Sequence, residues 1–330
     1  MTLQYDVAAI GNAIVDVIAT ADDAFLAENG LVKGSMALID AGQAESLYAK
    51  MGQAIETSGG SAGNTIAGVA SLGGQAAYIG KVADDQLGGF FAHDLKAIGA
   101  TFHGQPLVGG APTARSLINV TPDGERTMCT YLGACTELTA ADVDPGIIEA
   151  SFCAYLEGYL FDPPEARRAF AKAAGLAHGA GRLIAMTLSD SFVVERHREG
   201  LLAFIDTQVD VVFANSEEVK ALFQTDDFAS ASARLAEKAK IAAVTNGAEG
   251  SLVLSGRDSH VIPAVPVDKV VDTTGAGDQY AAGFLFGLAR GRSLEVCGRL
   301  GSMAAAEVIS HIGPRPQVSL ADLARTQGLL

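Results

Sequence analysis

Residues 272–278 read Asp272-Thr273-Thr274-Gly275-Ala276-Gly277-Asp278, and they run directly into an apolar helical pattern formed by Ala281, Phe284, Leu285 and Leu288. Gly275 and Gly277 carry no Cβ atoms, so several backbone N–H groups can point into one concavity at the start of this helix. The unpaired N–H groups of a first helical turn and the helix dipole both favour an anion at such a place. A carboxylate at Asp278 would repel the anion, unless it takes a proton from a group that attacks it. Capping of the helix is the alternative role for Asp278, because aspartate often does this.

The composition is that of an ordinary folded protein with an acidic charge balance. The chain has 330 residues, which is enough for one large α/β domain or two smaller ones. Hydrophobic residues make up 49% and charged residues 18%, and the formal net charge is −15. No Lys/Arg cluster supplies the basic face that nucleic acids or anionic membranes need, so we expect neither as a partner. Any phosphate must therefore be held by backbone amides and a few basic side chains.

The cysteines and the N-terminal segment indicate the compartment. The chain has four cysteines, Cys129, Cys135, Cys153 and Cys297. They show no C-x-x-C spacing, which fits reduced thiols better than disulfides or zinc. Asp6 and Asp16 interrupt the first apolar stretch and no basic region precedes it, so we expect no signal peptide. No window of about twenty apolar residues predicts a membrane span. We expect a cytoplasmic protein.

Two polar segments lie near the N-terminus. Residues 5–10 predict a buried strand that meets a loop at Gly11-Asn12, and Asp16 lies in an otherwise apolar run. A lone buried Asp is costly without a partner, so Asp16 either faces solvent or binds something. Asn12 and Asp16 together could hydrogen-bond vicinal hydroxyls. The segment Ser58-Gly59-Gly60-Ser61-Ala62-Gly63-Asn64 then precedes a helix of small residues, where the glycines either make an ordinary turn or let a ligand approach the backbone.

A hairpin interrupts the middle of the chain, and an alternation of strands and helices follows it. Residues 113–120 and 126–131 predict two strands joined by a turn. Such a hairpin often covers a site, although Arg126 next to the turn is equally explained as a surface charge. From residue 150 onward, short apolar runs alternate with helical patterns, which predicts a doubly wound α/β sheet. The ligands of such sheets bind at the carboxyl ends of the strands.

Several enzyme classes lack their signatures in this sequence. No G-x-x-x-x-G-K-[ST] occurs, which argues against a Walker-type NTPase. No G-x-G-x-x-G follows the first strand, which argues against a nicotinamide dehydrogenase. The serines and histidines form no nucleophile elbow.

Four motifs together resemble the ribokinase-like (PfkB) family of carbohydrate and nucleoside kinases. Residues 272–278 match its C-terminal signature D-T-x-G-A-G-D without departure, and Gly59, Gly60 and Asn64 resemble its G-G-x-x-x-N element. Residues 215–218 resemble the N-x-x-E motif and residues 245–250 the T-x-G-x-x-G loop. The four motifs fall in family order and span nearly the whole chain. The resemblance implies one kinase domain over residues 1–330, a mostly parallel sheet flanked by helices, and a small discontinuous β lid at about 12–40 and 108–132.

The resemblance also implies an ATP-dependent phosphotransferase. Asp278 would be the general base, and the backbone of Gly275, Ala276 and Gly277 would form an anion hole for the transferred phosphoryl group. Arg126 matches a lid arginine that approaches the phosphoryl oxygens. Catalysis would then consist mostly of positioning and charge stabilisation.

The nucleotide and metal positions follow from the same resemblance. Thr245, Gly247 and Gly250 would bind the nucleotide. Asn215 and Glu218 would act through Mg²⁺ and its water molecules, because Mg²⁺ keeps much of its hydration shell. Many members of the family need a monovalent cation such as K⁺, for which Asp272 is the candidate position.

The substrate subsite is similar to that of the adenosine kinase subfamily. Residues 11–16 match its pattern G-N-x-x-x-D and residues 59–64 its pattern G-G-S-A-x-N, which includes Ser61. By this resemblance Asn12, Asp16, Gly60 and Asn64 would bind the ribose 2′ and 3′ hydroxyls and leave the 5′ hydroxyl facing Asp278. An apolar slot for the base would be lined by Ile14, Met36, Leu38, Met128 and Tyr159. Met36 replaces a more polar residue of that subfamily, and all five side chains are equally explained as core.

The first functional hypothesis is therefore a kinase that converts adenosine to AMP, in purine salvage or in catabolism. A ribose- or fructose-type sugar kinase of the same family is the second hypothesis. A catalytically silent ligand-binding relative is the third, and the intact Asp278 and glycine signature argue against it. The expected partners are ATP and a small nucleoside or sugar, and the chain is expected to be a monomer or a homodimer formed through the lid.

Overall fold

The computed structural model describes residues 2–330 and contains two sheets, the larger of which carries most of the core. The larger sheet is parallel from β6 to β12 and antiparallel at β13 and β14. Its strands in spatial order are β14 (Asp258–Ile262), β13 (Ser251–Ser255), β12 (Ile241–Thr245), β11 (Val211–Asn215), β10 (Leu183–Thr187), β9 (Ser151–Glu157), β1 (Tyr5–Ile10), β5 (Ala76–Ile79) and β6 (Thr101–His103). The predicted mostly parallel sheet is confirmed.

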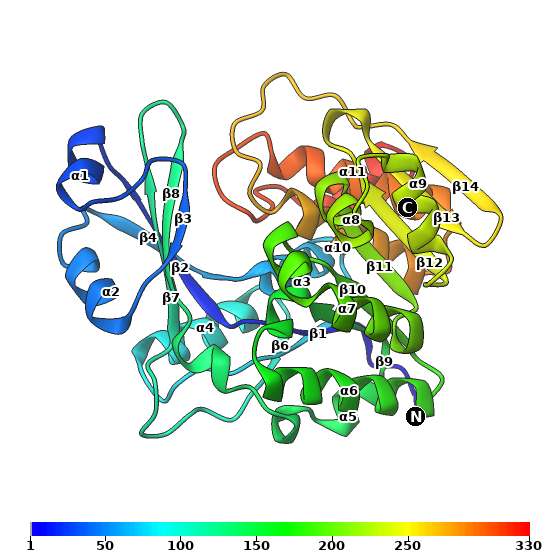
Figure 1. Cartoon of the computed structure of the whole chain (residues 1–330), viewed down its shortest axis with the longest axis horizontal. Coiled ribbons are helices and arrows are strands. Elements are labelled where there is room, and N and C mark those ends of the chain that lie inside the picture. The colour runs from blue at the N-terminus through cyan, green and yellow to red at the C-terminus, as the bar shows by residue number, and fades with distance from the viewer. Residues whose placement is uncertain (1) are drawn as a thin grey trace.

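Helices cover both faces of the large sheet, so its strands are apolar on both sides (Figure 1). Along β9 the buried side chains alternate: Cys153 and Tyr155 belong to one core, and Ala154 and Leu156 to the other. One face carries α3 (Ser61–Ser71), α4 (Gln86–Ala97), α10 (Ala276–Ala289) and α11 (Leu294–Val308), and α12 (Leu320–Thr326) packs on α3 and α11. The other face carries α5 (Pro145–Glu149), α6 (Pro164–Gly179), α7 (Ser191–Gln208), α8 (Ser216–Phe223) and α9 (Phe228–Ala236).

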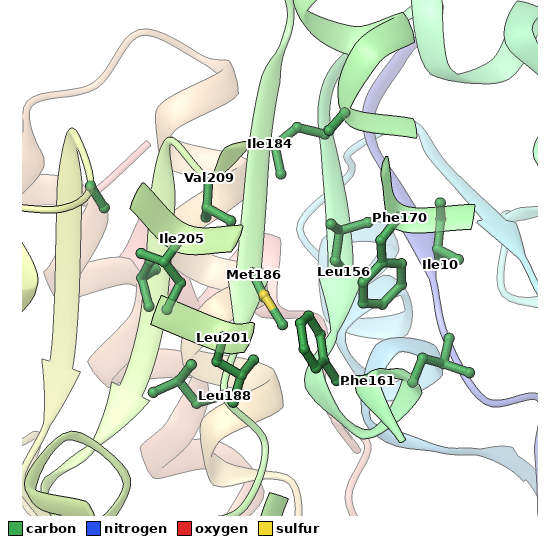
Figure 2. Packing of buried hydrophobic residues seen from close by; sticks show 14 of the residues in the cluster. Ile10, Leu156, Phe161, Phe170, Ile184, Met186, Leu188, Leu201, Ile205 and Val209 are labelled. Carbon is green, nitrogen blue, oxygen red and sulfur yellow. The ribbon is translucent and has the colours of Figure 1, made fainter. Parts of the chain in front are cut away.

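The core on the second face is rich in large aliphatic side chains. Figure 2 shows Met186 of β10, and Leu188 directly after this strand, among side chains of α6 and α7 that include Phe170, Leu201 and Ile205. All five are fully buried. Burial of this kind is the main driving force for the fold, since each large aliphatic or aromatic side chain contributes roughly 1.5–3 kcal/mol.

The smaller sheet stands apart from the larger one in Figure 1 and is built from distant segments of the chain. Its strands in spatial order are β3 (Met36–Leu38), β8 (Arg126–Tyr131), β7 (Ala114–Val120), β2 (Ile14–Thr20) and β4 (Ala54–Gly59), with α1 (Asp23–Glu28) and α2 (Ala41–Tyr48) beside them. The predicted hairpin is β7 and β8. The sheet also includes β4, which lies beyond the expected range 12–40. This strand was not expected because the polar residues Glu56, Thr57 and Ser58 interrupt the apolar pattern that would predict it.

Two features of this architecture bring the site residues together. The chain moves from β1 to β5 on one side and later to β9 on the other, so the carboxyl ends of β1 and β9 form a topological switch point. On the covering face α3 and α10 pack closely at Gly68, where a Cβ atom would lie 2.2 Å from Gln279 Oε1 and 2.6 Å from Ala282 Cβ. This close packing places the two helix N-termini side by side.

Two expectations about the chain as a whole can be compared with the fold. All four cysteines are buried and free of disulfide bonds. Between residues 2 and 330, none of the helices combines the length and apolar character that a bilayer crossing requires.

Candidate functional site

A cavity of about 540 Å³ lies between the small sheet and the carboxyl ends of the large-sheet strands. Its lining contains most of the predicted residues, namely Asn12, Ile14, Asp16, Met36, Leu38, Gly60, Ser61, Asn64, Met128, Tyr159, Asn215, Glu218, Thr245, Gly275, Ala276, Gly277 and Asp278. The structure therefore brings together residues that lie more than 250 positions apart in the sequence. Five predicted residues are placed outside this lining: Gly59, Arg126, Gly247, Gly250 and Asp272.

Asp278 is fixed by two side chains of α3. Ser61 Oγ donates to Asp278 Oδ1 at 2.6 Å, and Asn64 Nδ2 donates to Asp278 Oδ2 at 3.0 Å. Asp278 is the third residue of α10, whose N-cap is Gly275, and no side chain makes a capping hydrogen bond there. The capping alternative for Asp278 is therefore excluded, and its carboxylate faces the cavity.

The environment of Asp278 favours a carboxylate that holds a proton more readily than usual. Burial raises its pKa to about 6, and the hydrogen bonds from Ser61 and Asn64 oppose this shift. A carboxylate with this pKa is ionised at neutral pH and is a stronger base than an exposed aspartate, which suits it to accept a proton.

The glycines beside Asp278 shape the start of α10. Gly275 has φ of +78°, a conformation that strongly favours glycine, and a Cβ atom there would lie 2.7 Å from Pro314. Ala276 donates its N–H to the Thr273 carbonyl at 3.2 Å. Gly277 and Asp278 occupy the next positions of the first turn, whose N–H groups have no acceptor within the helix. The geometry thus provides amides for an anion directly beside the carboxylate.

Asn12 and Glu157 meet at the switch point between β1 and β9. Asn12 Nδ2 donates to Glu157 Oε1 at 2.8 Å, and the Ala62 N–H donates to Glu157 Oε2 at 2.9 Å. Glu157 is 1% exposed, and burial raises its pKa to about 7 against these two hydrogen bonds. Glu157 also lines the cavity, and we had not predicted it. The available signal was a carboxylate at the end of a buried strand directly before Gly158, the same type of signal that pointed to residues 215–218.

Asp16 is buried beside the glycine turn. It is 8% exposed, and among the described residues no side chain or amide donates a hydrogen bond to its carboxylate. A Cβ atom on Gly59 would lie 2.3 Å from Asp16 Cγ, so Gly59 acts by allowing the backbone to approach Asp16 rather than by lining the cavity. Burial raises the pKa of Asp16 to about 6, opposed by the charges of Arg315 and Arg126. Such a carboxylate retains its capacity to accept hydrogen bonds from a ligand.

The apolar wall of the cavity comes mainly from the small sheet. Met36 and Leu38 of β3 are paired in register with Met128 and Thr130 of β8. Tyr159, in the 3₁₀ turn that follows β9, also lines the cavity, as does Phe192 of α7, which was not predicted. Met36 and Leu38 are 50% and 63% exposed, so the alternative that they belong to the core is wrong.

Asn215 and Glu218 form a reciprocal cap at the start of α8. Asn215 Oδ1 accepts from the Glu218 N–H at 2.9 Å, while the Glu218 carboxylate accepts from the Asn215 N–H at 3.0 Å and from Asn215 Nδ2 at 2.7 Å. Burial raises the pKa of Glu218 to about 7. The N-x-x-E motif thus has a clear structural role, and Glu218 still lines the cavity. Across the part of the chain that the structure describes, no three His, Cys, Asp or Glu side chains form a metal-binding group.

The T-x-G-x-x-G motif contributes to the cavity through Thr245 at the end of β12. Gly247 and Gly250 have φ of +55° and +95°, and a Cβ atom on Gly250 would lie 2.1 Å from the Ile262 carbonyl oxygen. These glycines shape the turn between β12 and β13, which sets the position of Thr245.

Arg126 and Asp272 contact each other instead of lining the cavity. Arg126 Nη1 pairs with Asp272 Oδ2, and both side chains are buried. Asp272 also accepts the N–H groups of Thr274 and Gly313, each at 2.9 Å. Burial opposes ionisation of Asp272, but these hydrogen bonds and the Arg126 charge outweigh it and lower its pKa. Asp272 Oδ2 is thus engaged by the arginine and the Gly313 amide, while Oδ1 accepts the Thr274 N–H.

The sequence model of pfkB family carbohydrate kinases matches residues 6–320. The chain belongs to this family. As a pfkB kinase it is an ATP-dependent phosphotransferase that acts on a hydroxyl group, and its two sheets have the ribokinase-like arrangement.

The pfkB kinase is similar to solved structures with two different substrate descriptions. An adenosine kinase from Sinorhizobium meliloti is 58% identical, with a TM-score of 0.91 over 98% of this chain and 99% of that one. A probable sugar kinase from Rhizobium etli CFN 42 is 52% identical, with a TM-score of 0.93 over 100% of both chains. Adenosine kinase of Saccharomyces cerevisiae is 28% identical over 92% of this chain and 95% of that protein. The similarity therefore shows that the chain is a kinase, while these relatives differ in the acceptor that their names give.

Proposed function

We propose that this pfkB kinase transfers the γ-phosphoryl group of ATP to the 5′ hydroxyl of a ribonucleoside, with adenosine as the preferred acceptor. The observation that supports this choice is the continuity of the cavity. Asp278, the polar residues Asn12 and Asp16, and the apolar residues Met36 and Leu38 all line one space of about 540 Å³. A free pentose would use only the polar part of this space, whereas a nucleoside would also cover the apolar wall.

The chemistry assigned to the chain's own residues begins with Asp278. Its carboxylate accepts the proton of the 5′ hydroxyl as the oxygen attacks the γ-phosphorus, and the bond to the bridging oxygen of ADP breaks. The N–H groups of Gly277 and Asp278 stabilise the negative charge on the transferred group. Ser61 and Asn64 hold the base in position, since each donates to one of its oxygens.

The sugar hydroxyls are assigned to Asn12 and Asp16, together with Asn64 and the backbone of Gly60. The nucleotide is assigned to the end of the cavity that contains Asn215, Glu218 and Thr245. Mg²⁺, held through water near Glu218, would supply charge neutralisation at the phosphates when bound.

The small sheet is proposed to act as a lid. Its strand β8 already reaches the segment before α10, because Arg126 contacts Asp272. Exclusion of water from the phosphoryl donor is the expected benefit of such closure. The lid predicts that ATP hydrolysis without an acceptor is much slower than phosphoryl transfer with one, and equal rates would contradict it.

A sugar kinase is the second candidate, favoured by the buried carboxylate of Glu157 at the polar end of the cavity. A thermal-shift panel of nucleosides and sugars, followed by steady-state kinetics with ATP, separates the two. Adenosine should raise the melting temperature most and yield AMP, because binding to the folded state stabilises it by mass action. Far more efficient turnover of ribose or fructose than of any nucleoside would overturn the nucleoside assignment.

A further inference from the structure

Arg315 lies behind the sugar end of the cavity and joins three separate parts of the chain. It follows α11 and reaches under the junction between β4 and α3. Arg315 Nη1 donates to Asp94 Oδ2 at 3.0 Å, and Arg315 Nη2 donates to Ser58 Oγ at 2.6 Å. Ser58 in turn donates its N–H and its hydroxyl to Asp94 Oδ2 at 2.9 and 2.5 Å. Arginine suits such a junction because its planar fork serves two acceptors in fixed directions.

The junction that Arg315 holds is in direct contact with the sugar subsite. Ser58 is followed by Gly59, whose Cβ atom would lie 2.3 Å from Asp16 Cγ. The next residue, Gly60, would place a Cβ atom 2.3 Å from the Asn12 carbonyl oxygen. The backbone that Arg315 fixes through Ser58 therefore packs against the Asp16 side chain and against the backbone of Asn12, the two residues assigned to the sugar hydroxyls.

Arg315 is also one of the two cations that act on Asp16. The charged groups that face the Asp16 carboxylate are Arg315 and Arg126, which favour its ionised form, and Asp278, which disfavours it. Arg126 is paired with Asp272 and Arg315 with Asp94, and the Nε atoms of both arginines have no hydrogen-bond partner among the described residues. Only an ionised Asp16 is purely an acceptor, so the charge balance at this carboxylate decides how well it receives two hydroxyl donors.

We propose that Arg315 is a positioning residue for the sugar subsite, which fixes the β4–α3 junction behind Asp16 and Asn12 and whose charge keeps Asp16 in the acceptor form. The inference rests on the proposed assignment of Asp16 to the hydroxyls of the acceptor. It adds a residue outside the cavity lining to the determinants of acceptor binding.

The test compares Arg315→Met, Arg315→Lys and Ser58→Ala with the wild type, in KM and kcat for adenosine at saturating ATP between pH 5 and 9. Arg315→Met should raise KM by at least about tenfold with a smaller change in kcat. It should also move the acidic limb of the kcat/KM profile to higher pH, because the pKa of Asp16 rises further when the Arg315 charge is lost. If the limb moves by one pH unit, kcat/KM at the acidic end should fall by about tenfold relative to the wild type. Arg315→Lys should keep the limb in place, and Ser58→Ala should raise KM without moving it.

Arg325→Met is the matched control, because this exposed arginine near the C-terminus also loses an ion pair, with Asp322. Its KM and pH profile should equal those of the wild type. The proposal would be overturned if the acidic limb of kcat/KM does not move in Arg315→Met, or if that variant loses only kcat. If Arg315→Met fails to fold, an unchanged KM in both Arg315→Lys and Ser58→Ala would overturn the proposal instead. If the wild type phosphorylates a sugar and not adenosine, the proposed function fails, and the same variants tested with that sugar still decide the role of Arg315.

Discussion

The wall of the cavity that carries Asp278 differs from the wall formed by the small sheet in how much of it is fixed before a ligand binds. Ser61 and Asn64 already hold the Asp278 carboxylate at 2.6 and 3.0 Å. On the small sheet, Met36 and Leu38 are 50% and 63% exposed and gain burial only when a ligand covers them. The preorganised wall suits chemistry and the open wall suits selection of the acceptor. Substitutions on the first wall should therefore change turnover, and those on the second should change affinity.

The largest effect is expected for Asp278→Asn. The amide preserves the shape of the side chain but accepts no proton, so kcat should fall by roughly 10²–10⁴. Binding of ATP, measured by calorimetry, should be retained because the nucleotide end of the cavity is unchanged. Near-normal turnover would remove Asp278 from its role and with it the distinction between the two walls.

The second prediction concerns the pH dependence of kcat/KM, to which each wall contributes one carboxylate. Burial raises the pKa of Asp278 and of Asp16 to about 6, so both are ionised above this pH and become protonated below it. Well below pH 6, kcat/KM of the wild type should fall by about 100-fold for each pH unit, because both carboxylates must be ionised. Asp16→Asn should show a fall of only about tenfold per unit. Equal slopes in the two proteins would show that one of the carboxylates does not matter.

The third prediction tests how much the buried carboxylate of Glu157 lowers the free energy of unfolding. Burial raises the pKa of Glu157 from 4.5 to about 7, so its ionised form is destabilising, and this cost grows as the pH rises through that window. Chemical denaturation should show that the stability of Glu157→Gln relative to the wild type increases by about 2 kcal/mol from pH 5.5 to pH 8.5. Glu237→Gln, which changes an exposed residue, is the control and should show no such change. A constant difference for Glu157→Gln would indicate that Glu157 is not neutralised in the folded protein.

The smallest effect is expected for Leu38→Ala on the open wall. The KM for adenosine should rise several-fold with kcat unchanged, because the lost side chain contacts ligand and not the reacting atoms. The free energy of unfolding should change by less than about 0.5 kcal/mol, since the leucine is mostly exposed in the free protein. A large loss of stability would show that β3 is part of a fixed core, and the contrast between the walls would disappear.

Much of the fold could be predicted because its signals are local. The alternating apolar and helical patterns after residue 150 correspond to β9 through β13 and α6 through α9. The small-residue segment before Asn64 indicated the start of α3 in the same way. Strand β4 was missed because Glu56 and Thr57 break the apolar pattern, and its pairing with β2 is a long-range contact.

The site was predicted where residues of a motif act together and was missed where a contact joins distant segments. Asn215 and Glu218 lie one helical turn apart, and their resemblance to the N-x-x-E motif indicated that they act together. Arg126 was recognised as a residue of interest, but its partner Asp272 is 146 positions away, and no spacing predicts that contact. The same holds for Arg315 and Ser58, whose contact depends on how the segment after α11 crosses beneath β4.

The buried cysteines have a consequence for following motion of the small sheet. Burial raises the pKa of all four thiols, Cys129, Cys135, Cys153 and Cys297, and a thiol must ionise and be reached by a reagent before it reacts. The natural chain should therefore stay unlabelled by maleimides while it is folded. A cysteine introduced at the exposed position of Leu38 would carry a fluorophore or spin label on the small sheet without removal of any native thiol, and its signal would report how β3 approaches the large sheet when nucleoside and ATP bind.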